Sequence, residues 1–172
     1  MSEIEMVHIK ERALFSMLLS TVEVYRHESL GLLLGYAGID RFVVEYAVPY
    51  QTAMKGYSWV APKSIAAERM EKMLKYVSLN LIGDFHSHTQ WGDSIAKPVP
   101  SGDDIADMGF NKVHIIVAIN DKVKFQKWHH KNTLLVGSLG EYTIEIGAYV
   151  LKGEYEAKPV KIVCPSATGL SY

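Results

Sequence analysis

Two histidines separated by one residue, His86 and His88, have the types and spacing that suit metal chemistry best in this sequence. They follow the apolar segment 81–85, which is typical of a buried strand. Because side chains two residues apart on a strand point to the same face, both imidazoles are expected to project toward one spot. Zinc in hydrolytic sites binds three protein ligands and keeps a fourth position for water, so one more donor is needed. Asp104 is a candidate, although a solvated histidine pair at a strand end is the alternative that the pair alone leaves open.

Ser101 and Asp104 have the spacing of a capping box at the start of a helix, an arrangement that stabilises a helix by about 1 kcal/mol. The predicted short helix, 101–109, begins after the loop that leaves His88. Asp104 in its first turn can therefore return to the histidine pair. The structural and chemical roles are compatible, because Ser101 can cap the helix while its hydroxyl faces a metal-bound water or a developing oxyanion.

The elements that position these residues follow from hydrophobic periodicity. Residues 9–25 and 64–80 carry apolar side chains at helical spacing, which predicts two amphipathic helices. A loop is expected at 89–100, because Pro98 and Pro100 interrupt both helix and sheet hydrogen bonding. Apolar or alternating segments predict strands at 30–36, 42–48, 81–85, 113–120, 122–130, 133–136, 142–151 and 160–164. The sequence thus predicts an α/β fold with a mixed central β-sheet, flanking helices and a strand-rich C-terminal extension.

Composition narrows the classes of protein and site. The 172 residues are 48% hydrophobic and 22% charged, which predicts a single packed domain over 1–172. A net charge of -1 makes nucleic acid and membrane surfaces unfavoured partners. The single cysteine, Cys164, excludes an internal disulfide and thiolate zinc sites. We expect a cytoplasmic protein, since the chain begins without a basic and apolar leader and has no apolar run of about 20 residues.

Several families with a His-x-His segment do not fit. Metallo-β-lactamases continue into an Asp-His pair, whereas Thr89 and Gln90 follow here. Amidohydrolases are built on barrels of about 250 residues, more than this chain supplies. Zinc deaminases need a paired-cysteine segment, which this sequence lacks.

The remaining pattern resembles the JAMM or MPN-plus family of zinc metalloproteases, which cut isopeptide or peptide bonds at the C-terminus of ubiquitin-like modifiers. The resemblance covers about residues 28–128. Glu28 precedes the glycine- and leucine-rich segment 30–36, and the segment after it ends at Pro49. A helix then leads to Gly83 and the His-Ser-His segment, and the pattern closes with Pro-Ser-x-x-Asp at 100–104. Four separate elements therefore occur in the family's order.

This resemblance implies a JAMM/MPN-like domain with its core at about 8–130 and a C-terminal extension at about 131–172. It implies that His86, His88 and Asp104 bind one zinc ion per chain. It also implies Glu28 as the general base and Ser101 as a hydrogen-bond donor to the tetrahedral intermediate. The residues alone leave other carboxylates open as the base, so the choice of Glu28 depends on the resemblance. The implied reaction is hydrolysis of an isopeptide or peptide bond after the tail of a ubiquitin-like protein.

Two departures and two alternatives accompany this interpretation. Thr89 replaces the proline that usually follows the second histidine, and the segment 89–100 is longer than the family's usual gap. That segment is expected to be either a flap over the substrate or a neutral insertion. The alternative functions are processing of a small sulfur-carrier protein and a non-catalytic MPN scaffold that binds partners. No oligomeric state is predicted.

Overall fold

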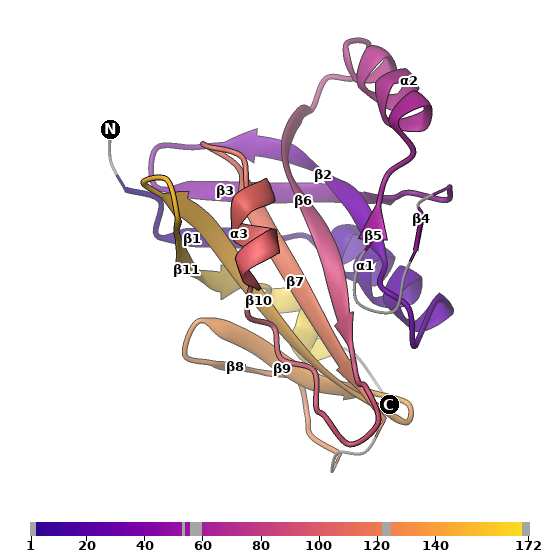
Figure 1. The fold of residues 1–172 in the computed structure, drawn as a ribbon. Coiled ribbons are helices and arrows are strands. Elements are labelled where there is room, and N and C mark those ends of the chain that lie inside the picture. Colours follow the sequence, from indigo (N-terminus) through magenta and orange to yellow (C-terminus); the bar gives the residue numbers. More distant parts are fainter. Residues whose placement is uncertain (1–2, 53, 56–59, 122–124, 170–172) are drawn as a thin grey trace.

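The computed structural model describes residues 3–52, 54–55, 60–121 and 125–169 (Figure 1). The elements in chain order are β1 (Met6–Ile9), α1 (Glu11–Glu23), β2 (Leu30–Ala37), β3 (Arg41–Pro49), β4 (Met54–Lys55), β5 (Val60–Ala61), α2 (Ser64–Leu74), β6 (Asn80–Thr89), α3 (Gly102–Asp107), β7 (Val113–Asn120), β8 (His129–Lys131), β9 (Leu134–Leu139), β10 (Tyr142–Lys152), β11 (Glu156–Val163) and the 3-10 helix η1 (Pro165–Gly169). Part of the strand expected at 122–130 falls on 122–124, outside the described residues.

Seven strands close into a barrel in the order β11-β1-β3-β2-β6-β7-β10, with β10 pairing back to β11. Closure depends on the length of β10, which has 11 residues. Its first half pairs with β9 and its second half with β11. The end of β11 then lies parallel to β1, with Met6 opposite Lys161.

The expected α/β fold, a JAMM/MPN-like mixed central sheet with flanking helices, is therefore wrong. The sheet is closed, few helices are present, and the supposed C-terminal extension supplies two strands of the barrel, β10 and β11. Periodicity identified most of the strands, but it carries no information about which distant strands pair. Pairing of β11 with β1 joins residues from opposite ends of the chain, a contact that no local pattern reveals.

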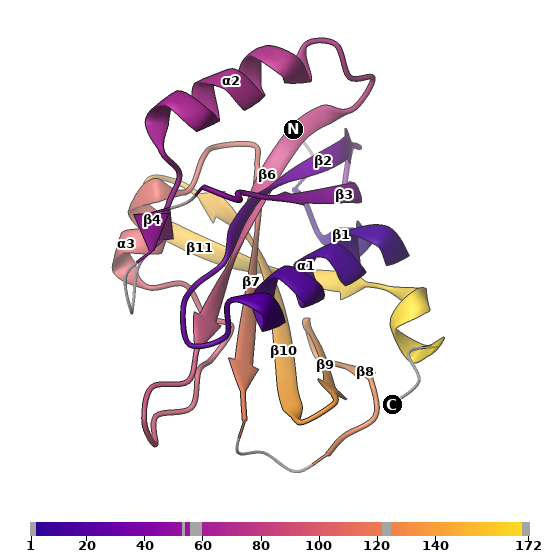
Figure 2. The same cartoon turned by 90° about the vertical axis from the view of Figure 1, so that its right-hand side faces the viewer.

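The two longer helices have different environments. The predicted helix at 9–25 is present as α1, which contacts β3 and β7 and contributes Leu14, Met17 and Leu18 to the main core. The second predicted helix, α2, ends at Leu74 rather than near residue 80, and none of its residues is buried. It stands apart from the closed sheet (Figure 2). Among the described residues, no helix is long and apolar enough to cross a membrane.

The outer face of the sheet carries a second, smaller apolar cluster, in which Met108, Ile116 and Tyr149 pack together. Met108 directly follows α3, so this cluster holds the short helix against β7 and β10. The loop that joins β6 to α3 lies on the same face, where the carbonyl oxygen of Pro98 accepts a hydrogen bond from the Tyr149 hydroxyl. The candidate site lies between this outer face and α3.

Candidate metal centre

Strand β6 points His86 and His88 to the outside of the sheet. Phe85 and Ser87, which alternate with them, are fully buried on the opposite face. This alternation is the geometry that the two-residue spacing predicts. It brings the two Nε2 atoms to 3.1 Å from each other.

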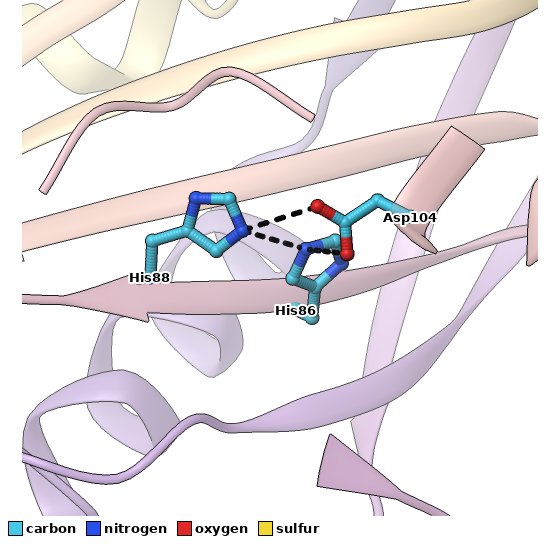
Figure 3. Close-up of side chains that lie close together, drawn as sticks. All are labelled: His86, His88 and Asp104. Carbon is cyan, nitrogen blue, oxygen red and sulfur yellow. Dashed lines mark hydrogen bonds and ion pairs between the residues drawn. The ribbon is translucent and has the colours of Figure 1, made fainter. Parts of the chain in front are cut away.

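Asp104 approaches the histidines from α3. Its backbone N–H donates to the Ser101 hydroxyl oxygen over 3.1 Å, and its carboxylate accepts the Ser101 backbone N–H over 2.6 Å, so the predicted capping box is present. The same carboxylate lies 3.3 Å from the Nε2 atom of His86 and 3.4 Å from that of His88 (Figure 3). The structure therefore brings the three predicted metal ligands together, and this group can hold a metal ion.

The separations between the donor atoms of the three side chains are short enough for one small ion. Zinc binds imidazole nitrogen and carboxylate oxygen at about 2.0–2.2 Å, so two donors of a tetrahedral site lie about 3.3–3.5 Å apart. The two Nε2 atoms lie 3.1 Å apart, and each has a different oxygen of the Asp104 carboxylate nearby, Oδ1 at 3.3 Å from His86 and Oδ2 at 3.4 Å from His88. The side chains are only 13–21% exposed, so they are partly shielded from water while remaining reachable. All three side chains line a cavity of the protein.

A backbone carbonyl fixes the ring of His88. Its Nδ1 atom lies 2.9 Å from the carbonyl oxygen of Lys97. A neutral imidazole carries a single N–H, so donation from Nδ1 leaves the Nε2 lone pair for a metal. Burial lowers the pKa of His88, but its hydrogen bonds to Asp104 and Lys97 outweigh burial and raise the pKa above the ordinary value of 6.5. A metal ion must therefore compete with a proton at this nitrogen.

Asp104 carries the negative charge of the group. Burial raises the pKa of its carboxyl, but hydrogen bonds from His86 and His88 and from the Ser101 N–H outweigh burial and hold the pKa well below 3.8. The carboxylate is therefore ionised at neutral pH and needs to lose no proton when a cation binds.

Glu28 lines the same cavity as the metal-binding group. Burial raises the pKa of its carboxyl above 4.5, while the nearby His88 and His86 act in the opposite direction. Its position depends on the next residue, Ser29, whose backbone N–H donates to the hydroxyl of Ser87 over 2.8 Å and whose carbonyl accepts the Ser87 N–H over 2.9 Å. Since Ser87 lies between the two histidines, these bonds fix Glu28 relative to the metal ligands.

Sequence reasoning missed this pair of serines. Both are buried, with Ser29 4% and Ser87 0% exposed, and their hydroxyl oxygens lie 3.1 Å apart. The sequence did offer a signal. Each serine directly follows a predicted site residue, and such a small polar side chain needs a hydrogen-bond partner when it is buried.

The site opens into a cavity of about 710 Å³ between β2, β6, α3 and the 89–101 loop. Beside the metal group, Asp84 and the buried His114 form a second His–carboxylate pair, with the carboxylate 3.0 Å from the histidine Nδ1. His114 thus also lines the cavity. The cavity is further lined by Leu30, Leu32, Tyr50, Trp91 and Ala96. It offers an apolar wall next to a concentration of hydrogen-bonding groups.

No protein-family model and no curated protein matches this chain. Among solved structures, it is similar to the solution structure of protein DSY2949 from Desulfitobacterium hafniense, with a TM-score of 0.63 over 92% of each chain. The two sequences are 15% identical, so this similarity concerns the fold alone.

Proposed function

We propose that this protein is a zinc-dependent hydrolase that cleaves a peptide or isopeptide bond after the C-terminal tail of a ubiquitin-like protein. The observation that carries the proposal is the gathering of His86, His88 and Asp104: the two Nε2 atoms lie 3.1 Å apart, and each lies within 3.4 Å of one oxygen of the carboxylate. Two imidazoles and one carboxylate with an open fourth vertex are the ligand set of hydrolytic zinc sites. A structural zinc site would instead be closed by a fourth protein ligand.

The chain's own residues supply the remaining steps of hydrolysis. A bound zinc ion would supply Lewis acidity and lower the pKa of water at the site. Glu28 accepts the proton from the attacking water and returns it to the leaving amine, so no covalent enzyme intermediate is needed. Its raised pKa brings the carboxyl closer to the working pH, which suits proton transfer in both directions. The Ser101 hydroxyl, whose oxygen accepts the Asp104 N–H, keeps its own proton to donate to the developing oxyanion.

The order of the motif supports a JAMM-type reaction. Glu28, the His86-Ser87-His88 segment and the Ser101-x-x-Asp104 segment occur in the order of those metalloproteases. Support comes from this motif and the site geometry, since the closed barrel is not the fold that the resemblance implied. The tail substrate is proposed because a flexible C-terminal strand can enter the cavity beside the ligands, which a folded domain cannot.

Metal analysis combined with a cleavage assay tests the proposal. Purified protein should contain about one zinc per chain, and His88→Ala should lose both zinc and cleavage of tail fusions. His129→Ala is the matched control, because His129 is an exposed histidine on β8 outside the cavity. Wild-type protein without zinc affinity, or full cleavage by His88→Ala, contradicts the proposal.

The substrate is tested by comparing three tails. The first substrate is a ubiquitin-like protein linked to lysine, the second is the same tail in a linear fusion, and the third is a linear fusion to a sulfur-carrier protein. Comparing their cleavage rates separates deconjugation from processing. Zinc binding without turnover of any of them would favour a non-catalytic scaffold.

A further inference from the structure

Asn120 ends strand β7 and holds the loop that follows β6. Its side chain is 2% exposed and makes two hydrogen bonds with the backbone of Ala96. The amide oxygen accepts the Ala96 N–H over 2.7 Å, and the amide nitrogen donates to the Ala96 carbonyl oxygen over 3.1 Å. Both backbone groups of Ala96 are thus satisfied by one buried side chain, as they would be by a neighbouring strand.

The residues after Ala96 are held in turn. The carbonyl oxygen of Lys97 lies 2.9 Å from the Nδ1 atom of His88. The carbonyl oxygen of Pro98 accepts the Tyr149 hydroxyl over 2.5 Å, and it packs so close to Gly147 that a Cβ there would lie 2.6 Å from it. Three consecutive residues are therefore fixed against the outer face of the barrel.

We infer that Asn120 is a positioning residue for the metal ligand His88, acting through the backbone of Ala96 and Lys97. The Lys97 carbonyl holds the His88 proton on Nδ1 and keeps the Nε2 lone pair aimed at the metal position. Without the two Asn120 bonds, that carbonyl is supported only from the side of Pro98, and the ring is held less firmly in its orientation. The long segment 89–100 is then a support for a ligand rather than a flap or a neutral insertion. This inference rests on the metal site of the proposed function, but not on its proteolytic activity.

Zinc affinity of Asn120 variants, measured by competition with a chromophoric chelator, tests the inference. Asn120→Leu has a similar volume and neither hydrogen bond, and should bind zinc about 10–100-fold more weakly, as expected for loss of support to a ligand. Asn120→Asp retains an acceptor for the Ala96 N–H and should lose less. Cobalt substitution gives a readout of ligand geometry, and the visible absorption of the Asn120→Leu cobalt form should differ from that of wild type.

Thr143→Val is the matched control. Thr143 lies directly opposite Asn120 in the β7–β10 pair and is equally buried, but its hydroxyl has no hydrogen-bond partner among the described residues. Its zinc affinity should equal that of wild type, because it does not hold the loop.

Folded Asn120→Leu with wild-type zinc affinity and an unchanged cobalt spectrum would overturn the inference. An equal loss in Thr143→Val would also overturn it, because the effect would then belong to the whole end of the sheet. If Asn120→Leu does not fold, Asn120→Asp decides by the same criteria. Wild-type protein that binds no zinc would overturn the metal site itself, whereas unchanged affinity in the Asn120 variants overturns this inference alone.

Discussion

Above about pH 6.5, the metal-binding group should stabilise the zinc-free fold less as the pH rises. With zinc present, the stabilisation should instead increase with pH. In the zinc-free chain the pKa of His88 is raised above 6.5, because its hydrogen bonds outweigh the opposing effect of burial. Its contribution is therefore complete below pH 6.5 and lost as the pH rises through the folded-state pKa. The pKa of Asp104 is lowered from 3.8, so its contribution is present above pH 3.8 and lost as the pH falls. The zinc-free group stabilises the fold most between pH 3.8 and 6.5.

Zinc binding acts in the opposite direction, because it must displace the proton of His88. At a free zinc concentration 100 times Kd, binding stabilises the folded chain by about 2.7 kcal/mol. For a chain of this length, that corresponds to a rise in Tm of about 5–11 °C. Below the pKa of His88, the zinc affinity falls about tenfold for each pH unit, and the stabilisation falls by about 1.4 kcal/mol. Asp104 is already ionised in this range and releases no proton.

Thermal unfolding between about pH 5.5 and 8, with chelator or with buffered free zinc, measures both effects. Subtracting the curve of the His88→Gln variant removes the contributions of other groups, such as His8, whose pKa is lowered by burial. The zinc-free difference should decrease above pH 6.5 while the zinc-induced rise in Tm increases. A zinc-induced rise that is equal at about pH 5.5 and 7.5, or a zinc-free difference that grows above pH 6.5, would refute the reasoning.

Three substitutions separate the roles of the other site residues. Glu28→Gln should lower kcat by about 10²–10⁴-fold with zinc still bound, since it removes the general base but no ligand. The control Glu23→Gln, at an exposed glutamate, should leave kcat unchanged. Loss of zinc in Glu28→Gln would contradict this role. Ser101→Ala should lower the free energy of unfolding by about 1 kcal/mol and kcat by about 10²–10³-fold. Ser101→Thr should restore both. A loss of stability with normal kcat would limit the role of Ser101 to capping the helix. Ser87→Ala should cost about 1–3 kcal/mol, because it leaves the buried N–H of Ser29 without its acceptor. Its kcat should also fall while zinc affinity is retained, and unchanged kcat would show that the serine pair does not place Glu28.

The parts of the site that could be predicted are those set by local geometry. The common face of His86 and His88 follows from the strand period, and the location of Asp104 in a first helical turn follows from its capping spacing with Ser101. Glu28 could be selected only through the resemblance, because nothing local distinguishes it from other carboxylates. The structure then places it on the same cavity as the histidines.

The supporting contacts could not be predicted, because they join residues that are distant in the chain. Ser29 and Ser87 meet only because β2 pairs antiparallel with β6, in a register with a shift between Leu33 and Leu34. The Asn120 bonds to Ala96 depend on β6 and β7 being parallel neighbours whose ends lie together. The same limit explains the incorrect fold class, since barrel closure depends on how β10 divides its length between two partners.

Under the proposed function, a bound ion would complete the chemistry rather than the fold. His86, His88 and Asp104 lie on the outer face, apart from the residues that form the main core within the closed sheet. Each segment that carries a predicted ligand is also fixed by bonds that involve no metal. Ser87 bonds to Ser29, Asp104 is held through the capping box, and the loop beside His88 is held by Asn120. A structural zinc site provides the folding energy that such bonds and such a core would otherwise supply. Here both are already present, so the three donor side chains are arranged before any ion binds, which the proposed hydrolytic site would require.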